Sequence, residues 1–376
     1  MRDRAEHPLF GRNKLKLGTF CTNTLSSFSS PPDAAAPQWS DILKCAQMAD
    51  AAGFEAIVPI ARWKGYIDDR IDHRSNYVFD AYCFAAALAQ ATSRAAIFAT
   101  THAPIIHPVA VAKSCATIDQ ISGGRFALNV VGGWNRREFE MFGIEMADHS
   151  ERYAYLEEWL NILRSLWTAE DELDWDSPRF HLRRALCRPQ PVTVGGPPIM
   201  NAGYSERGQQ FTAANSDIGL VQLQGDDPDG WSQQVRAYKD AAAKAGNPGL
   251  QVWTNAEVVQ AATDAEAYEI VRRYQDEYLD QESVDGFVAG LLRESGLGPD
   301  SPAAKSMREK TKSGTGYPLH GSAETIARKL EDMSNAGIDG VLLTWVEPLQ
   351  GIPLVIEHVL PLLERSGVRE MATEAA

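Results

Sequence analysis

The sequence predicts a closed (β/α)8 barrel, the TIM-barrel fold, as a single domain over residues 1–376 with insertions at the carboxyl-terminal face. Short apolar strands alternate with amphipathic helices, which is typical of parallel strands covered by helices. About eight strand candidates follow one another, the number that closes such a barrel. No GxGxxG motif follows the first strand, which disfavours an open dinucleotide-binding sheet.

The first half of the chain supplies four strand and helix pairs. The predicted strand at 15–21 opens into a Ser/Pro-rich loop at 22–37, and the predicted helix at 39–52 ends before Gly53, where a C-cap glycine belongs. Further strands are predicted at 54–60, 95–101 and 125–131. Helices are predicted at 77–93, 108–122 and 151–167. The strands are too continuously apolar to be half exposed, which indicates that both of their faces are covered.

The second half continues the alternation after an irregular passage. Strands are predicted at 197–203, 217–223, 250–260 and 338–345, and helices at 205–216, 230–246, 264–279, 322–337 and 353–367. The segment from about 280 to 318 is rich in Gly, Ser, Lys and Asp and is predicted to be an insertion. It is either a lid over the carboxyl-terminal face of the barrel or a disordered surface loop.

Composition excludes several classes of protein. The chain is 44% hydrophobic and 23% charged, as in globular domains. No run of 18 apolar residues is present, so no membrane span is predicted. The formal net charge of -14 disfavours nucleic acid as a partner. No apolar segment precedes Leu15, and the five cysteines are scattered without a CxxC, which together predict a cytoplasmic protein with reduced thiols.

In a barrel, residues at the carboxyl ends of the strands line the active site. This rule selects a set that is neutral and hydrogen-bonding, with some aromatic and basic members: 21–23, 61–64, 100–102, 129–137, 201–205 and 344–347. The set lacks the paired carboxylates of a glycosidase, a GxSxG elbow and a two-His-plus-carboxylate metal site. A site so poor in nucleophiles and metal ligands predicts that a bound cofactor performs the chemistry.

Asn129 is the sharpest candidate in this set. It lies within an apolar strand, where its amide either donates to a ring carbonyl or bound oxygen at the barrel mouth or simply pairs with neighbouring backbone. Glu138 either anchors the following loop through Arg136 or Arg137 or accepts a hydrogen bond from a ligand. Trp63 and Trp134 either stack on a flat ring or belong to ordinary packing.

A phosphate site is predicted from two helix starts. Ser205 would cap the helix that follows it, and the free N–H groups of that first turn would face an anion. Arg152 and Tyr153 offer a cation and a phenol to the same phosphate. The alternative is that Ser205 is only an N-cap and that Arg152 and Tyr153 form a solvent-exposed helix start.

The segment 98–143, "FATTHAPIIHPVAVAKSCATIDQISGGRFALNVVGGWNRREFEMFG", resembles the bacterial luciferase-like flavin monooxygenases. More narrowly, it is similar to the branch that contains the uracil-ring-cleaving pyrimidine monooxygenase and the dimethylsulfone and alkanesulfonate monooxygenases. The resemblance covers most of 15–367 and is densest from Gly53 to Trp167, where "TIDQISGGRFALNVVGGW", "RYAYLEE" and "LWT" match. It is specific for the family and weak for the substrate.

The resemblance implies a TIM barrel that binds reduced FMN and reacts it with O2. The matching FMN-contacting positions are Ala61, Arg62, Asn129, Glu138, Arg152, Tyr153 and Ser205. Thr100 matches a threonine that helps the asparagine hold oxygen, and His102 is the nearby candidate for proton transfer. Pro59, Trp63 and the loop after the first strand depart from the pyrimidine enzyme, and this departure puts uracil itself in doubt as the substrate.

The predicted function is therefore that of a two-component FMN-dependent monooxygenase, supplied by a separate NAD(P)H-dependent flavin reductase. It would cleave a C–N or C–S bond in a small heterocyclic or organosulfur compound, with pyrimidine-like rings, riboflavin and sulfones as candidates. No metal is expected, and relatives are commonly homodimers or homotetramers. The alternatives are a deazaflavin-dependent oxidoreductase on the same barrel, which would transfer hydride without O2, and a non-enzymatic flavin-binding relative.

Overall fold

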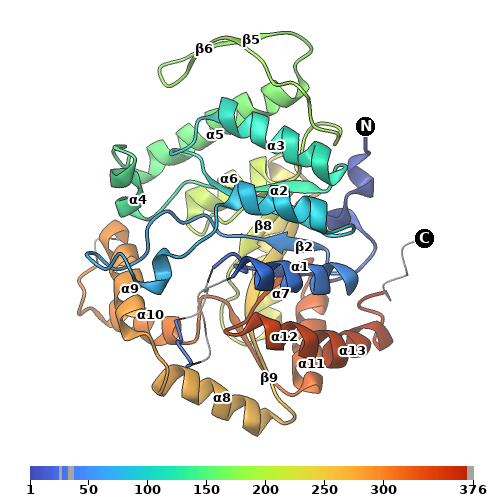
Figure 1. Ribbon diagram of the computed structural model, residues 1–376, viewed down its shortest axis with the longest axis vertical. Coiled ribbons are helices and arrows are strands. Elements are labelled where there is room, and N and C mark those ends of the chain that lie inside the picture. Colours follow the sequence, from blue (N-terminus) through green and yellow to red (C-terminus); the bar gives the residue numbers. More distant parts are fainter. Residues whose placement is uncertain (25–27, 33–37, 296, 371–376) are drawn as a thin grey trace.

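The computed structural model describes residues 1–24, 28–32, 38–295 and 297–370. Within them, eight parallel strands form a closed ring in the order β11, β1, β2, β3, β4, β7, β8, β9, and β9 pairs with both β8 and β11. The ring strands are β1 (Lys16–Phe20), β2 (Ala56–Val58), β3 (Ala96–His102), β4 (Phe126–Val131), β7 (Ile199–Asn201), β8 (Ile218–Val221), β9 (Gln251–Gln260) and β11 (Gly340–Thr344). The predicted (β/α)8 barrel is confirmed (Figure 1).

Helices surround this ring. Those that follow the first strands are α1 (Trp39–Ala51), α2 (Ala81–Ala91), α3 (Pro108–Ser122), α4 (Arg136–Met141) and α5 (His149–Thr168). The second half contributes α6 (Glu206–Asn215), α7 (Pro228–Lys244), α8 (Asp264–Asp276), α9 (Gln281–Ser295), α10 (Pro302–Lys312), α11 (Ala323–Asn335), α12 (Pro348–Leu354) and α13 (Leu360–Arg365), with a π-helical stretch at Val355–Val359. Short 3-10 helices lie at Arg4–Glu6, Pro8–Phe10 and Arg74–Asn76.

Alternate residues of each strand point to opposite faces of the sheet, and both faces are buried, which explains why the strand sequences are uniformly apolar. One set fills the barrel interior: Ala56, Val58, Ala96, Phe98, Ala127, Met200, Ile218, Leu220, Trp253 and Leu342. The other set packs outward against the helices, as Leu128 does against the α3 and α5 side and Val341 against the α11 side. Because both faces are buried, neither set shows the alternation of a half-exposed strand.

Two regions differ from the expectation. The passage between α5 and β7 contains an antiparallel hairpin, β5 (Leu173–Asp176) and β6 (His181–Ala185), which projects from one end of the molecule (Figure 1). The insertion at 280–318 forms α9 and α10 and runs into an extra strand, β10 (Tyr317–Gly321), which pairs in parallel with the outer half of β9. The described part of the insertion is therefore helical, and the disordered-loop alternative is wrong for it.

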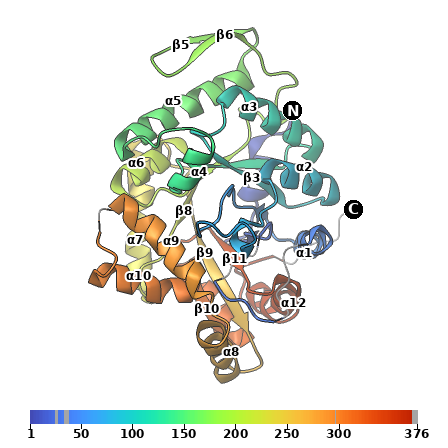
Figure 2. The same ribbon diagram turned by 60° about the vertical axis from the view of Figure 1, so that its left-hand side comes forward.

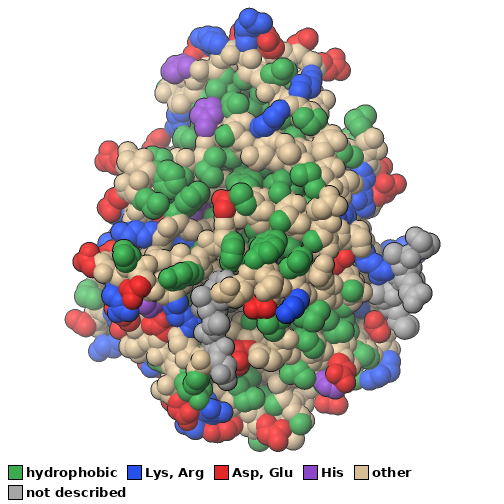
Figure 3. Space-filling view, viewed as in Figure 1, with side chains coloured by type: hydrophobic (Ala, Val, Ile, Leu, Met, Phe, Trp, Pro, Cys, Tyr) green, Lys and Arg blue, Asp and Glu red, His purple; other side chains and the backbone are tan. Residues whose placement is uncertain are grey.

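The surface carries charges of both signs. On the face shown in Figure 3, acidic and basic side chains are interspersed, and the end formed by the hairpin is densely charged. Ion pairs there include Arg184 with Glu172 and Arg183 with Asp176. Among the described residues, no helix is both long and apolar enough to cross a membrane.

Candidate active site

A pocket of about 80 Å³ lies at the carboxyl ends of β2 and β3. It brings together five residues that the sequence singled out: Ala61, Arg62, Trp63, Thr100 and His102. The remaining lining is mostly apolar or aromatic and consists of Val78, Phe79, Asp80, Ala81, Tyr82 and Ile106. Figure 2 shows α4 and α9 on the side of the barrel toward which these strands run.

Thr100 and Asn129 are register partners on the adjacent parallel strands β3 and β4. Their side chains are buried, and Asn129 Nδ2 donates to Thr100 Oγ1 at 3.2 Å. Thr100 Oγ1 in turn lies 2.5 Å from the carbonyl oxygen of Pro59, to which it donates. The predicted pair is therefore formed directly by strand register, and it is linked to the end of β2.

Asn23 braces the same end of β2. Its side chain is fully buried, with Nδ2 donating to the carbonyls of Ile60 at 2.8 Å and Phe79 at 2.9 Å, while Oδ1 accepts from the N–H of Ile60 at 3.0 Å. These bonds replace the strand partner that Ile60 lacks once β2 has ended. The other part of the loop after β1, at 25–27 and 33–37, lies outside the described residues.

Asn129 Oδ1 has a different environment. This oxygen is buried and has no hydrogen-bond partner among the described residues. A buried acceptor without a donor costs free energy, and such atoms in native proteins commonly mark a ligand or water site. The orphan atom of this pair is therefore an acceptor, whereas the sequence pointed to a donor role.

His102 and Glu138 form a second buried pair beside Thr100. His102 Nδ1 lies 3.1 Å from Glu138 Oε2, and both side chains are buried. Glu138 Oε1 accepts from the N–H of Trp63 at 2.8 Å and more weakly from that of Lys64 at 3.4 Å. Burial raises the pKa of Glu138, but His102 and these N–H groups outweigh it and hold the pKa below its usual value.

The anchoring of the loop after β4 differs from the expectation. Arg137 does not pair with Glu138 but binds Asp68, with Nε to Oδ1 at 2.6 Å and Nη2 to Oδ2 at 2.9 Å. Glu138 thus binds the loop after β2 at Trp63, and Arg137 binds the same loop at Asp68. Both contacts join the loop after β2 to the loop after β4.

Aromatic rings from distant segments meet over this region. Trp134 contacts Tyr66 and Phe287, with ring centroids 6.1 and 5.3 Å apart, and Phe28 lies 5.3 Å from Phe287. The guanidinium of Arg62 stacks over the Tyr66 ring at 4.5 Å. Trp134 therefore packs against α9 and the loop after β2. No periodicity in the sequence predicted that Phe287 joins this group, because the group exists only when the insertion folds back.

The predicted phosphate residues form another group, at the amino end of α6. Ser205 caps α6 by accepting from the N–H of Gly208 at 3.1 Å. A Cβ at Gly208 would collide with the Tyr153 hydroxyl and with Gly203, so only glycine fits there. Arg152, in the first turn of α5, donates from Nη1 to the carbonyl of Gly133 at 3.0 Å. This bond ties the start of α5 to the loop after β4, four residues beyond Asn129.

A buried carboxyl that the sequence did not reveal lies on β9. Glu257 points from β9 toward Gly314, and its Oε1 lies 3.9 Å from His320 Nε2 on β10. Burial raises the pKa of Glu257 to about 8 and lowers that of His320 to about 4. The sequence predicted the strand at 250–260 but not β10, so it gave no sign that the outer half of β9 is covered by another strand.

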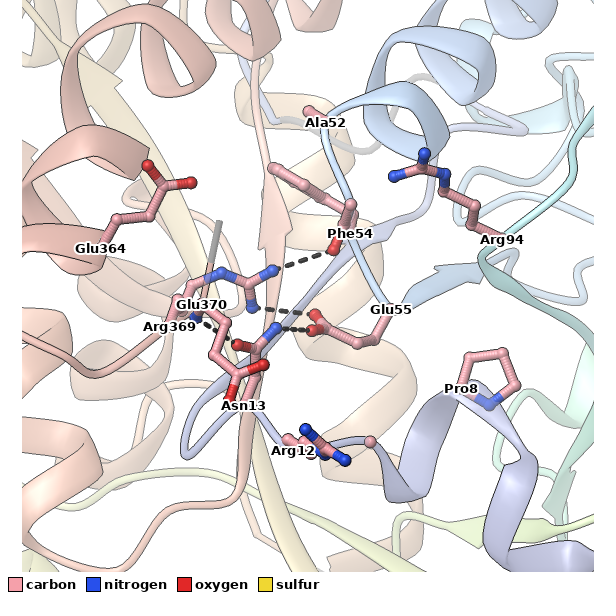
Figure 4. Close-up of a pocket in the computed structure, with 12 residues that line it drawn as sticks. Pro8, Arg12, Asn13, Ala52, Phe54, Glu55, Arg94, Glu364, Arg369 and Glu370 are labelled. Atoms are coloured by element: carbon pink, nitrogen blue, oxygen red, sulfur yellow. Dashed lines mark hydrogen bonds and ion pairs between the residues drawn. The ribbon is translucent and has the colours of Figure 1, made fainter. Parts of the chain in front are cut away.

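A larger cavity of about 280 Å³ lies at the opposite, amino-terminal end of the barrel (Figure 4). There Glu55 accepts from Arg369 Nη1 at 2.9 Å and from the N–H of Leu17 at 2.8 Å, and Asn13 bonds to its other oxygen. Most of its lining residues precede β1, β2 or β3, and the others lie in α13 or after it, so by the barrel rule this end serves stability and not chemistry. The smaller pocket is the candidate site because it holds the polar side chains at the strand ends.

No group of three His, Cys, Asp or Glu within the described part of the chain could hold a metal ion. Cys21, at the end of β1, is buried, and burial raises the pKa of its thiol to about 12. Its backbone adopts φ 62°, an uncommon value for a non-glycine residue. The site therefore offers neutral hydrogen-bonding groups and one His–Glu pair.

Comparisons with known proteins found chains similar to this one along most of its length. The chain is 29% identical to the pyrimidine monooxygenase RutA of Acinetobacter baylyi over 365 residues, which cover 93% of this chain and 95% of the relative. It is 33% identical to RutA of Cronobacter turicensis, covering 76% and 75%. It is 29% identical to the FMNH(2)-dependent dimethylsulfone monooxygenase of Pseudomonas fluorescens, covering 88% of each chain.

Solved structures show the same fold. A riboflavin lyase (RcaE) with modified FMN and riboflavin superimposes with a TM-score of 0.84 at 22% identity, covering 96% of this chain and 94% of the other. The long-chain alkane monooxygenase LadA gives a TM-score of 0.83 at 20% identity, covering 97% and 94%. The family model described as luciferase-like monooxygenase matches residues 15–340. With most of its length inside that match, the chain belongs to the luciferase-like monooxygenase family.

Proposed function

We propose that this monooxygenase uses reduced FMN and O2 to oxidise and cleave a C–N or C–S bond in a small heterocyclic or organosulfur compound. The observation that carries the proposal is the buried, neutral Thr100–Asn129 pair, of which Thr100 lines a small, largely apolar pocket together with His102. The names of the curated relatives, which act on pyrimidines and on dimethylsulfone, support this class of reaction.

The residues present fit FMN at two separate places. Asn129 Oδ1 is a buried acceptor without a donor, as expected where a ring N–H binds. The first turn of α6 lies against Gly203, and its N–H groups are the anion-binding kind found at helix starts. We assign Ala61, Arg62, Asn129 and Glu138 to the ring side and Arg152, Tyr153 and Ser205 to the phosphate side.

Bound reduced FMN supplies the electrons that activate O2. The residues around the pocket supply neutral contacts, since Asn129 Nδ2 retains one N–H beyond the one given to Thr100. A neutral donor stabilises developing negative charge on oxygen without giving up its proton. His102 lines the same pocket and is oriented by Glu138, so we assign it the movement of a proton to or from substrate.

Water must be kept from the reacting atoms. We assign this role to α9 and its aromatic contacts with Tyr66 and Trp134, so that the segment at about 280–318 acts as a lid. The contacts of Gly286 and Gly290 with Tyr66 and Trp134 support a closely fitted cover.

The pocket lining suggests which substrates fit. Trp63, Phe79 and Tyr82 give it flat aromatic walls, and Thr100, His102 and Arg62 give it a few polar groups. This pattern is suited to a small planar ring with one or two polar substituents. Pyrimidine-like rings, riboflavin and sulfones remain the candidates, and a separate NAD(P)H-dependent flavin reductase would supply the flavin. We also propose a cytoplasmic location and a homodimer or homotetramer.

The test is rapid mixing of the protein and chemically reduced FMN with O2, followed by absorbance. The proposal predicts a transient spectrum distinct from those of reduced and oxidised FMN, and incorporation of ¹⁸O from O2 into product during a screen of nitrogen heterocycles and sulfones. Binding of a deazaflavin with hydride transfer and no O2 consumption would contradict it. Binding of FMN without any product across the screen would indicate the non-enzymatic alternative.

A further inference from the structure

Asn129 presents one atom whose role the proposed FMN site does not yet define. Its Oδ1 is buried without a partner among the described residues, whereas its Nδ2 donates to Thr100. Which atom of the amide is turned away from Thr100 decides whether the site offers an acceptor or a donor there.

Proton counting at Thr100 fixes that orientation. Thr100 has a single hydroxyl hydrogen, and the carbonyl of Pro59 lies 2.5 Å from Oγ1, so the hydrogen is given to Pro59. Oγ1 can then only accept from Asn129, which requires Nδ2 to face it. A flipped amide would place two acceptors against each other at 3.2 Å. Oδ1 is therefore the atom left to a ligand.

The other buried asparagines at strand ends behave differently. Asn201 donates to the carbonyl of Val130 at 2.6 Å and accepts from Thr212 Oγ1 at 2.7 Å. Asn23 is likewise bonded at both its amide atoms. An unpaired oxygen is thus particular to Asn129 among these three, and it lies next to the pocket that holds Thr100 and His102.

Flavin chemistry identifies the donor that such an oxygen would take. The ring edge that reacts with oxygen must face Thr100 and His102, and N5 is the atom on that edge that can carry a hydrogen, because the neighbouring O4 only accepts. Two-electron reduction places a hydrogen on N5, whereas oxidised N5 carries only a lone pair. We propose that Asn129 Oδ1 accepts the N5–H of reduced FMN and is the residue by which this site distinguishes reduced from oxidised flavin.

This inference rests on the proposed function and adds a selectivity to it. With reduced FMN the buried oxygen is paired, and with oxidised FMN it faces another acceptor and stays unpaired. A penalty of that kind corresponds to about a tenfold preference in binding. The same tenfold ratio raises the midpoint potential of the bound two-electron couple by about 30 mV relative to a site without the preference.

The experiment is an anaerobic titration of the full-length protein with reduced and with oxidised FMN, giving the ratio of the two dissociation constants. Asn129→Leu removes the acceptor at similar volume, and its ratio should fall about tenfold from that of the wild type. Thr101→Val is the matched control: its hydroxyl is on the next residue of β3, is buried and bonds to neither Asn129 nor Pro59, so the ratio should stay unchanged.

A ligand-side measurement avoids dependence on the folding of the variant. In 5-deaza-FMN a carbon replaces N5, so its reduced form has no N–H at that position. The wild-type protein should bind the reduced and oxidised forms of this analogue with a ratio about tenfold lower than for FMN.

The outcomes separate the two proposals. If neither redox state of FMN binds, the proposed function fails. If FMN binds but the ratio is the same in wild type and Asn129→Leu, or the same for FMN and 5-deaza-FMN, the inference is overturned while the proposed function stands. In that case the partner of Oδ1 would be a flavin donor present in both redox states.

Discussion

Thr100 has one hydroxyl proton, and the structure commits it to the carbonyl of Pro59. The side chain therefore acts in two ways, as an acceptor for Asn129 and as a tie between the ends of β3 and β2. Sequence similarity identified Thr100 but not which of its hydrogen bonds it donates and which it accepts. That assignment depends on which carbonyl lies opposite the hydroxyl. The amide N–H of Asn129 is the remaining donor of the pair.

Thr100→Ala should abolish the oxygen-dependent transient while changing the affinity for reduced FMN by no more than about threefold. The alanine leaves the amide of Asn129 and the carbonyl of Pro59 without their partner, so the variant should also lose about 1–3 kcal/mol of stability. Stopped-flow absorbance, flavin titration and thermal unfolding measure the three effects. Thr101→Val is the control, and loss of FMN binding in Thr100→Ala would refute the assigned roles.

Glu257 makes stability depend on pH in a direction opposite to that of most carboxylates. Its pKa is about 8 in the folded protein and about 4.5 when unperturbed, so the folded state retains the proton over that interval. The stability this provides is fully present below about pH 4.5 and is lost as the pH rises to about 8. His320 at 3.9 Å does not compensate, because burial lowers its own pKa to about 4.

Glu257→Gln should therefore stabilise the protein increasingly as the pH is raised from 5 to 8, with no further gain above that. Melting temperatures of wild type and variant at each pH measure the difference. Glu170→Gln, an exposed glutamate before the hairpin, controls for the change in net charge. A difference between Glu257→Gln and wild type that does not vary with pH would show that Glu257 titrates normally.

At the scale of single elements, the insertion departs most from its sequence prediction. Its composition suggested a loop, but α9 turns Phe287 and the small residues Gly286 and Gly290 toward the loops after β2 and β4. Glycines inside a helix lower helix propensity, which weakened the sequence signal. At Gly286 the backbone of Tyr66 approaches too closely for a side chain, and at Gly290 the ring of Trp134 would lie only 3.2 Å from a Cβ.

Gly286→Ala should displace α9, because the new Cβ would collide with the carbonyl of Tyr66. If α9 is the lid, the variant will oxidise more reduced flavin without forming product than the wild type does. The ratio of O2 consumed to product formed measures this difference. Limited proteolysis should cut the 280–318 segment faster. Gly298→Ala is the control, since no heavy atom lies within 4 Å of its Cβ position. Unchanged coupling in Gly286→Ala would leave α9 without a role in shielding the site.

The same reasoning explains the other elements that were not predicted. The β5–β6 hairpin is short, and its strands carry mostly exposed and charged residues, so no apolar periodicity marks it. Strand β10 follows the insertion directly and is defined by its pairing with β9. By contrast α3 was predicted at its observed bounds, because His107 caps it and Gly123 ends it in the left-handed conformation.

At the scale of the whole molecule, the barrel separates a structural end from a chemical end. At the amino-terminal end Arg369 joins the last segment of the chain to the first, donating to the carbonyls of Leu15 and Gly53 and to Glu55 (Figure 4). Glu55 and Arg369 are both buried, and each is the charged partner of the other. The larger cavity therefore lies beside an ion pair that holds the segment after α13 against the starts of β1 and β2.

Arg369→Met should destabilise the protein by about 3–5 kcal/mol, because it leaves Glu55 buried with its charge unpaired. Flavin affinity and the oxygen-dependent transient of the folded fraction should remain as in wild type, since the clamp lies at the opposite end. Chemical denaturation and flavin titration measure these. Arg365→Met, an exposed arginine on α13, serves as the control. A loss of flavin binding in folded Arg369→Met would show that the two ends are coupled.

The sequence by itself determined the barrel and the order of its eight ring strands, and it predicted strand-end residues of which Ala61, Arg62, Thr100 and His102 line one pocket. Strand and helix periodicities are local, and a parallel strand end always delivers its last residues to the same face. The tertiary structure alone decided the partners: Pro59 for Thr100, Trp63 for Glu138, Asp68 for Arg137 and Phe287 for Trp134. It also left Asn129 Oδ1 unpaired and paired Glu257 with His320. These facts depend on contacts between residues far apart in the chain, and hydrogen bonds and burial are properties of such contacts, not of residue types or their spacing.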